Sequence, residues 1–127
     1  MIDSTIAFTL FDKLLAALGL IRDGQKKRTE KTDQALTALH NTILETKSYI
    51  HKREDGMPRD RSQEFSIAEL WQKSSIPLRE IDVELAEKCF LKSGYWMEPE
   101  IWNEGKIRSK GIAIDAVFEA TRQLLLK

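Results

Sequence analysis

The two histidines are the scarcest side chains in this chain that could carry proton-transfer or metal chemistry. His40 and His51 are eleven residues apart, close to three helical turns, so a helix would place them on one face about 16 Å apart. One metal ion cannot bind both across that distance. Neither belongs to a Glu-x-x-His pair or to a His-Glu-x-x-His motif. We therefore expect two surface or boundary histidines, with no metal and no cofactor.

Carboxylates crowd the segment 80–87, where a pair of them could transfer protons. On a helix these acids share one face, formed by Glu80, Glu84 and Glu87. General acid–base catalysis needs carboxylates in a partly dry hollow with separated pKa values, whereas this spacing predicts a solvated face. The only cysteine, Cys89, lies on the apolar phase, so we expect an inert buried thiol. No glycine-rich phosphate loop is present, and we do not favour an enzyme.

Clusters of basic side chains could bind the phosphates of a nucleic acid. The candidates form two clusters. The first basic cluster comprises Lys26, Lys27 and Arg28, and the second comprises Arg59 and Arg61. Phosphate recognition needs such charges together on one exposed face. A helix between the two clusters would hold them about 35 Å or more apart, and acids interleave the second cluster. A nucleic-acid-binding or nucleolytic accessory role is therefore an alternative function.

An aromatic-rich segment precedes the last predicted helix. It contains Tyr95, Trp96, Met97 and Trp102. Tryptophan and tyrosine anchor protein interfaces when they are exposed. The same rings can instead fold back and close the end of a helical bundle, each burying about 150–250 Å². We favour the second interpretation and keep these four residues as an alternative partner surface.

Composition limits the classes of protein that the chain can belong to. The 127 residues suit one domain, residues 1–127, with 42% hydrophobic and 31% charged residues. The formal net charge is zero, so strong non-specific attraction to nucleic acid or anionic lipid is not expected. A single cysteine forms no intrachain disulfide, which fits a reducing compartment. We expect a cytoplasmic protein.

The first predicted helix begins at Asp3 or Ser4, either of which can cap it. Its wide apolar face comprises Phe8, Phe11, Leu14, Leu15, Leu18 and Ile21. Gly19 or Gly24 ends the helix. The apolar run from Ile6 to Ile21 is interrupted by Thr9, Asp12 and Lys13, so we do not expect it to span a membrane. Insertion of this face into a membrane interface is a further alternative, with few flanking cations to support it.

The second predicted helix spans residues 26–52 and has the most regular apolar spacing in the chain. Its face is Thr32, Leu36, Leu39, Ile43, Thr46 and Ile50. The basic start at Lys26 is unfavourable near the positive end of a helix dipole. The apolar stripe stays in phase with that of the first helix, so one long helix from Ser4 to Lys52 remains open.

The third predicted helix starts at Ser66, which forms a capping box with Glu69, while Phe65 staples onto Leu70. The sequence Ile76-Pro77 predicts a kink or a break. Asp82 can cap a fresh start, and that helix runs to about Leu91.

The last predicted helix begins between Lys106 and Ile112 and ends near Leu126. Its apolar face is Ile114, Val117, Phe118, Thr121 and Leu125.

Together, the predicted helices indicate an all-α, four-helix-bundle-like fold with a kinked or broken third helix. Broad apolar faces without assembled chemistry favour a non-enzymatic interaction or oligomerisation module. Its expected partner is another copy of the chain, in a homodimer, or a different protein.

Overall fold

The computed structural model describes residues 2–91, 93–102 and 104–126, without the side chains of residues 2–10, 95, 99–100, 104–107 and 109–110. Within these ranges the chain forms five α-helices, two short 3-10 helices and no β-strand. The elements are α1 Ile2–Arg22, α2 Glu30–Glu54, α3 Arg61–Leu78, α4 Val83–Leu91, η1 Ser93–Met97, η2 Pro99–Trp102 and α5 Glu104–Leu125. The all-α class is confirmed, with five α-helices in place of the four expected.

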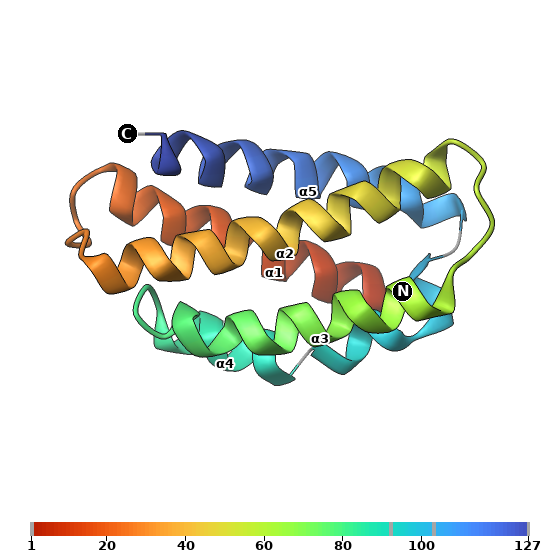
Figure 1. Ribbon diagram of the computed structural model, residues 1–127, viewed down its shortest axis with the longest axis horizontal. Helices are drawn as coiled ribbons and strands as arrows, with labels where there is room; N and C mark the ends of the chain where they lie inside the picture. Colours follow the sequence, from red (N-terminus) through yellow and green to blue (C-terminus); the bar gives the residue numbers. More distant parts are fainter. Residues whose placement is uncertain (1, 92, 103, 127) are drawn as a thin grey trace.

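The helices run up and down along one long direction (Figure 1). The central helix α2 packs most extensively against α5 on one side and α3 on the other, while α1 lies against α5. The hairpin of α3 and α4 forms the layer on the side away from α5. The α2–α3 connection and the two 3-10 helices lie at the same end of the molecule (Figure 1).

A turn separates α1 from α2, so the alternative of one helix from Ser4 to Lys52 is wrong. Gly24 has a φ of +77°, the left-handed conformation that ends helices and that suits glycine. The side chain of Thr29 then caps α2 by accepting a 3.2 Å hydrogen bond from the Thr32 amide. Because α2 begins at Glu30, Lys26 lies in the connection and not in the first helical turn.

The predicted core face of α2 is confirmed, because all six of its residues are buried. Its polar members are satisfied: Thr46 accepts a 3.0 Å hydrogen bond from the indole N–H of Trp71 and donates one of 2.8 Å to the carbonyl of Thr42. On the α5 side, a Cβ added to buried Gly111 would lie 3.2 Å from a methyl group of Ile50. Glycine therefore permits close approach of α2 and α5.

The N-cap of α3 lies six residues earlier than predicted, so the Ser66–Glu69 capping box and the Phe65–Leu70 staple are wrong. Asp60 is the N-cap and accepts a 3.1 Å hydrogen bond from the Gln63 amide. The ring of Phe65 is half exposed, with the Arg61 guanidinium 4.9 Å from its centroid.

The kink or break predicted at Ile76-Pro77 is not confirmed, because α3 continues through these residues to Leu78. Pro77 lies in the last turn, where the N–H that it lacks removes little of the helical hydrogen bonding. The helices part only over residues 79–82. Asp82 then accepts a 3.1 Å hydrogen bond from the Leu85 amide, which confirms the predicted fresh start, and α4 ends at Leu91 as expected.

The faces of the two outer helices largely match the prediction. In α5, which begins at Glu104, the predicted face is buried or partly buried, and Leu124 joins it. In α1, the described members of the face are buried except Leu15, which is partly buried, and the side chain of Phe8 lies outside the described residues. Phe11 packs 6.2 Å from Trp96, ring centre to ring centre, and is therefore unavailable for membrane insertion. In the part of the chain that the structure describes, every helix is too short or too polar to cross a membrane.

Candidate functional site

The aromatic segment closes one end of the helical core. The indole ring of Trp96 stacks on that of Trp71, with 5.3 Å between ring centres and 5° between planes. Trp102 donates a 2.9 Å hydrogen bond to the Trp96 carbonyl, and both side chains are buried. The folded-back interpretation is confirmed for these two residues, which are not exposed partner anchors. Met97 is exposed, and the side chain of Tyr95 lies outside the described residues.

The arginines of the second basic cluster bind an acid inside the protein. Arg59 donates hydrogen bonds of 2.7 and 3.2 Å to the carboxylate of Glu64, and Arg61 donates one of 2.5 Å. The Glu64 side chain is fully buried. Both guanidinium groups therefore have an internal carboxylate as their partner, which weakens their attraction to phosphate.

The first basic cluster lies at the opposite end of α2 (Figure 1). Lys26 and Lys27 lie in the α1–α2 connection, and Arg28 forms a 2.6 Å ion pair with Asp33. The structure therefore keeps the two clusters apart, as the sequence suggested. Nucleic-acid binding by these residues stays a prediction.

Glu64 was not among the predicted site residues, although it is the most enclosed charge that the structure describes. Burial alone would raise the pKa of Glu64, but hydrogen bonds from Arg59, Tyr49 and Arg61 outweigh burial and hold it below its usual value. Burial and the bond to Glu64 raise the pKa of Tyr49. We call these four residues the Glu64 cluster. Both carboxylate oxygens of Glu64 accept hydrogen bonds within the cluster. The cluster is therefore structural and offers no vacant position for a ligand.

The histidines lie at the boundary and the surface, as predicted. The ring of His40 stacks on Phe118 at 5.0 Å between centres. His51 is exposed, and its two nitrogens lie 3.3 Å from Glu54 and 3.5 Å from Asp115. Among the described residues, no group of three histidine, cysteine or acidic side chains could hold a metal ion.

The acidic segment is arranged as the spacing predicts. Glu80, Glu84 and Glu87 are exposed, whereas Cys89 is buried. Burial raises the pKa of the Cys89 thiol to about 12, so almost none of it is the reactive thiolate at neutral pH.

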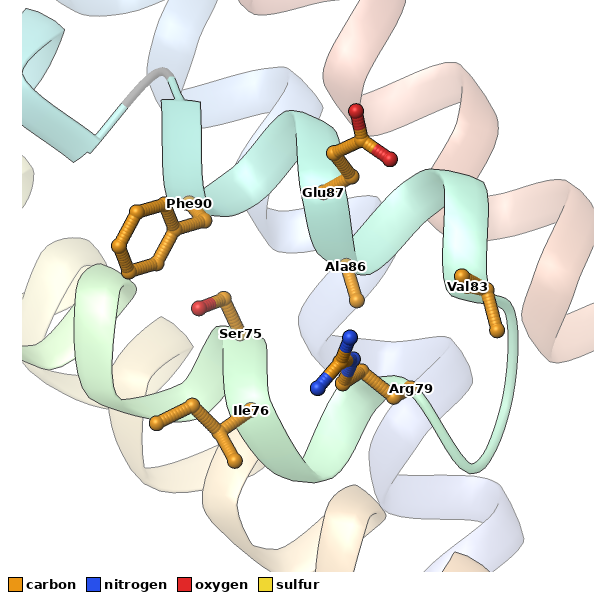
Figure 2. A pocket seen from close by; sticks show the side chains of 7 residues that line it. All are labelled: Ser75, Ile76, Arg79, Val83, Ala86, Glu87 and Phe90. Carbon is orange, nitrogen blue, oxygen red and sulfur yellow. The ribbon is translucent and has the colours of Figure 1, made fainter.

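A groove between α3 and α4, the α3–α4 groove, is the strongest candidate for a functional site (Figure 2). Its volume is about 330 Å³ and its floor includes buried Ser75 and Ala86. Ile76, Val83 and Phe90 line it, with 64%, 60% and 48% of their surfaces exposed. This site was not predicted from the sequence. The signal that could have revealed it is a set of large apolar residues off the core-facing phase of each helix.

One cation and one anion complete the groove. Arg79 extends from the end of α3 into the groove toward Ala86, whereas Glu87 lies on the α4 wall with its carboxylate directed away from α3 (Figure 2). Among the described residues, neither side chain has an ion-pair or hydrogen-bond partner. The arrangement can therefore bind an apolar surface that carries both charges. Comparison with protein-family models, with curated proteins and with solved structures finds no match to this chain.

Proposed function

We propose that this protein is a non-enzymatic interaction module that associates with itself through the α3–α4 groove. The observation that carries the proposal is the exposure of Ile76, Val83 and Phe90 around one groove. Complete burial of a large apolar side chain contributes about 1.5–3 kcal/mol. These half-exposed side chains retain a substantial part of that contribution for association.

The distribution of the other exposed apolar residues supports the choice of this face. On the remaining elements they are spread over separate helices and connections, and include Leu20, Leu44, Met57, Ile112 and Leu126. The groove instead brings three together on two adjacent helices. Clustering of this kind, flanked by polar groups, is typical of interaction sites on small proteins.

The chemistry of the groove supports binding more than catalysis. Its hydroxyl group, from Ser75, donates a 2.6 Å hydrogen bond to the Gln72 carbonyl of its own helix. Its single carboxylate, from Glu87, is exposed, whereas a general acid or base works in a partly dry site beside a second titrating group. The compartment that we propose is the cytoplasm, since the one thiol of this chain cannot form an intrachain disulfide.

Light scattering coupled to size exclusion, at protein concentrations from micromolar to hundreds of micromolar, tests the proposal. The wild-type mass is expected to rise with concentration from 14.6 kDa toward twice that value. Phe90→Asp places a charge in the groove and is expected to keep the protein monomeric. Leu44→Asp is the matched control, because Leu44 on α2 is exposed to the same 48% but lies outside the groove.

Two results would contradict self-association through this groove. One is a wild-type mass that stays at the monomer value throughout the range. The other is an equal effect of Phe90→Asp and Leu44→Asp on the mass. Circular dichroism of each variant verifies that the helical fold is retained.

A further inference from the structure

We propose that the α3–α4 groove also binds a small amphipathic carboxylate, which lays its apolar chain along the groove and pairs its carboxylate with Arg79. Such a ligand occupies the surface on which the second copy docks, so it competes with self-association. Binding of the carboxylate is independent of the proposed function, and only the competition rests on that function.

The dimensions of the groove suit a small ligand. Its volume of about 330 Å³ lies within the range of about 300–1,000 Å³ that small-molecule sites occupy. Its floor includes the small, buried side chains of Ser75 and Ala86. Val83 and Phe90 lie at the two ends of the α4 wall (Figure 2), separated by two helical turns or about 10.5 Å of rise. An extended chain of medium length, such as that of octanoate, can therefore lie along this wall.

The walls select a ligand with an apolar chain. The side chains of Ile76, Val83 and Phe90 leave about half or more of their surfaces in contact with water. A hydrocarbon chain that lies on them removes this surface from water, which favours binding. The hydroxyl group of Ser75 donates its hydrogen bond to the Gln72 carbonyl, at 2.6 Å. The floor therefore favours a chain that carries no polar group where it crosses the groove.

Arg79 selects a negatively charged head group. Its guanidinium group lies in the groove and faces Ala86, while the carboxylate of Glu87 is directed away from α3 (Figure 2). Glu80 and Asp82, the acids that follow Arg79 in sequence, lie outside the groove wall. A guanidinium group can donate two parallel hydrogen bonds to one carboxylate. One cation matches one negative charge, so the ligand that fits best is a monocarboxylate.

Two smaller hollows on the protein also contain a cation, but in both the chain itself supplies the anion. A hollow of about 170 Å³ between α1 and α5 contains Arg22, whose guanidinium lies 3.0 Å from the carboxylate of Asp23. A hollow of about 200 Å³ between α1 and α4 contains Lys13, whose ammonium lies 3.7 Å from the carboxylate of Glu84. Arg79 has no such carboxylate among the residues that the structure describes. Its charge is therefore left for a ligand.

Titration of the isotope-labelled full chain with octanoate, followed through its amide resonances, tests the inference. The resonance shifts are expected to saturate and to concentrate on residues 75–90, which contain the groove. Octylammonium has the same chain and the opposite charge, and it is expected to bind about fivefold more weakly. Octanoate shifts that are spread over the whole surface, or that are absent at about tens of millimolar, would overturn the inference.

The variant Arg79→Gln separates the contribution of the head group from that of the chain. It keeps an exposed polar side chain and removes the charge, so the affinity for octanoate is expected to fall about fivefold. The affinity for octanol, which has the chain without the charge, should stay the same. The matched control is Arg108→Gln on α5, an exposed arginine outside the groove, which should leave both affinities at the wild-type values. An equal loss of octanoate affinity in both variants would show that Arg79 does not hold the carboxylate.

Light scattering of the wild type with saturating octanoate tests the competition. The mass is expected to fall toward the monomer value of 14.6 kDa, and the same concentration of octylammonium should have a smaller effect. A wild type that is monomeric without octanoate contradicts the proposed function and leaves the carboxylate site standing. A dimer that persists while octanoate shifts the groove resonances rules out the competition. A dimer whose groove resonances do not respond to octanoate rules out the carboxylate site and leaves the proposed function standing.

Discussion

The hydroxyl group of Tyr49 on α2 donates a hydrogen bond to the buried carboxylate of Glu64 on α3. The same hydroxyl oxygen accepts a 3.1 Å hydrogen bond from the amide of Asp60, which caps α3. One phenol therefore ties together two helices and the connection between them. Arg61, a second member of the Glu64 cluster, also donates a 2.7 Å hydrogen bond to the Met97 carbonyl in η1. The Glu64 cluster thus fixes where three segments meet.

Replacing Glu64 with glutamine keeps the size of the side chain and removes its charge. Hydrogen bonds to charged groups contribute about 1.5–3 kcal/mol each, and the two arginines are about a third exposed, so water compensates part of the loss. We expect Glu64→Gln to lower the free energy of unfolding by about 2–3 kcal/mol in urea titrations. Glu69→Gln on the same helix, whose 3.6 Å pair with Lys73 is exposed, should change it by less than about 0.5 kcal/mol.

The lowered pKa of Glu64 predicts that the free energy of unfolding falls as the pH is lowered. Between its folded pKa and its ordinary value of 4.5, the unfolded chain binds more protons than the folded one. The stability contributed by the charged carboxylate is therefore complete above pH 4.5 and is lost as the pH falls through the lowered value. We expect the difference in unfolding free energy between wild type and Glu64→Gln to shrink below pH 4.5. A difference that stays constant from pH 7 to about pH 3 would contradict this account.

The three tryptophans, all buried, predict the fluorescence of the protein. The folded state should emit at short wavelength and resist quenching by acrylamide, and unfolding should shift the emission to longer wavelength. Trp96→Ala removes the ring that stacks on Trp71 and leaves a cavity, so it is expected to cost about 3–5 kcal/mol. Chemical denaturation followed by circular dichroism measures this cost. Strong acrylamide quenching of the native wild type would contradict the buried positions.

The cap of α4 links stability to the groove. Asp82→Ala removes the acceptor of the Leu85 amide and is expected to cost about 1 kcal/mol in unfolding free energy. Because α4 forms one wall of the groove, its first turn also holds Val83. We expect this variant to weaken self-association several-fold. Thr37→Ala, an exposed change on α2, serves as the control and should alter neither quantity.

Local spacing predicted the elements better than it predicted their contacts. The face from Thr32 to Ile50 follows from helical periodicity, and the cap at Asp82 follows from one side chain and its neighbouring amides. The start of α3 did not follow from such reasoning, because Asp60 and Ser66 are both competent caps. The first is favoured by Tyr49, a residue of another helix.

The functional surface was also beyond local reasoning. The sequence places Arg61 three residues before Glu64, a helical ion-pair spacing, but the third and fourth members of the Glu64 cluster come from a connection and from α2. In the same way, Ile76 and Phe90 belong to different helices. Only the hairpin of α3 and α4 brings them to one groove.

The buried position of Cys89 has a practical consequence. It is the only thiol in the chain and its side chain is enclosed, so a thiol-specific reagent can modify it only when the interior opens. The rate of modification in native buffer therefore reports how often α4 detaches. Dimerisation that holds α4 in place would slow that reaction. The modification rate of this one thiol would therefore report both local opening of the protein and dimer formation.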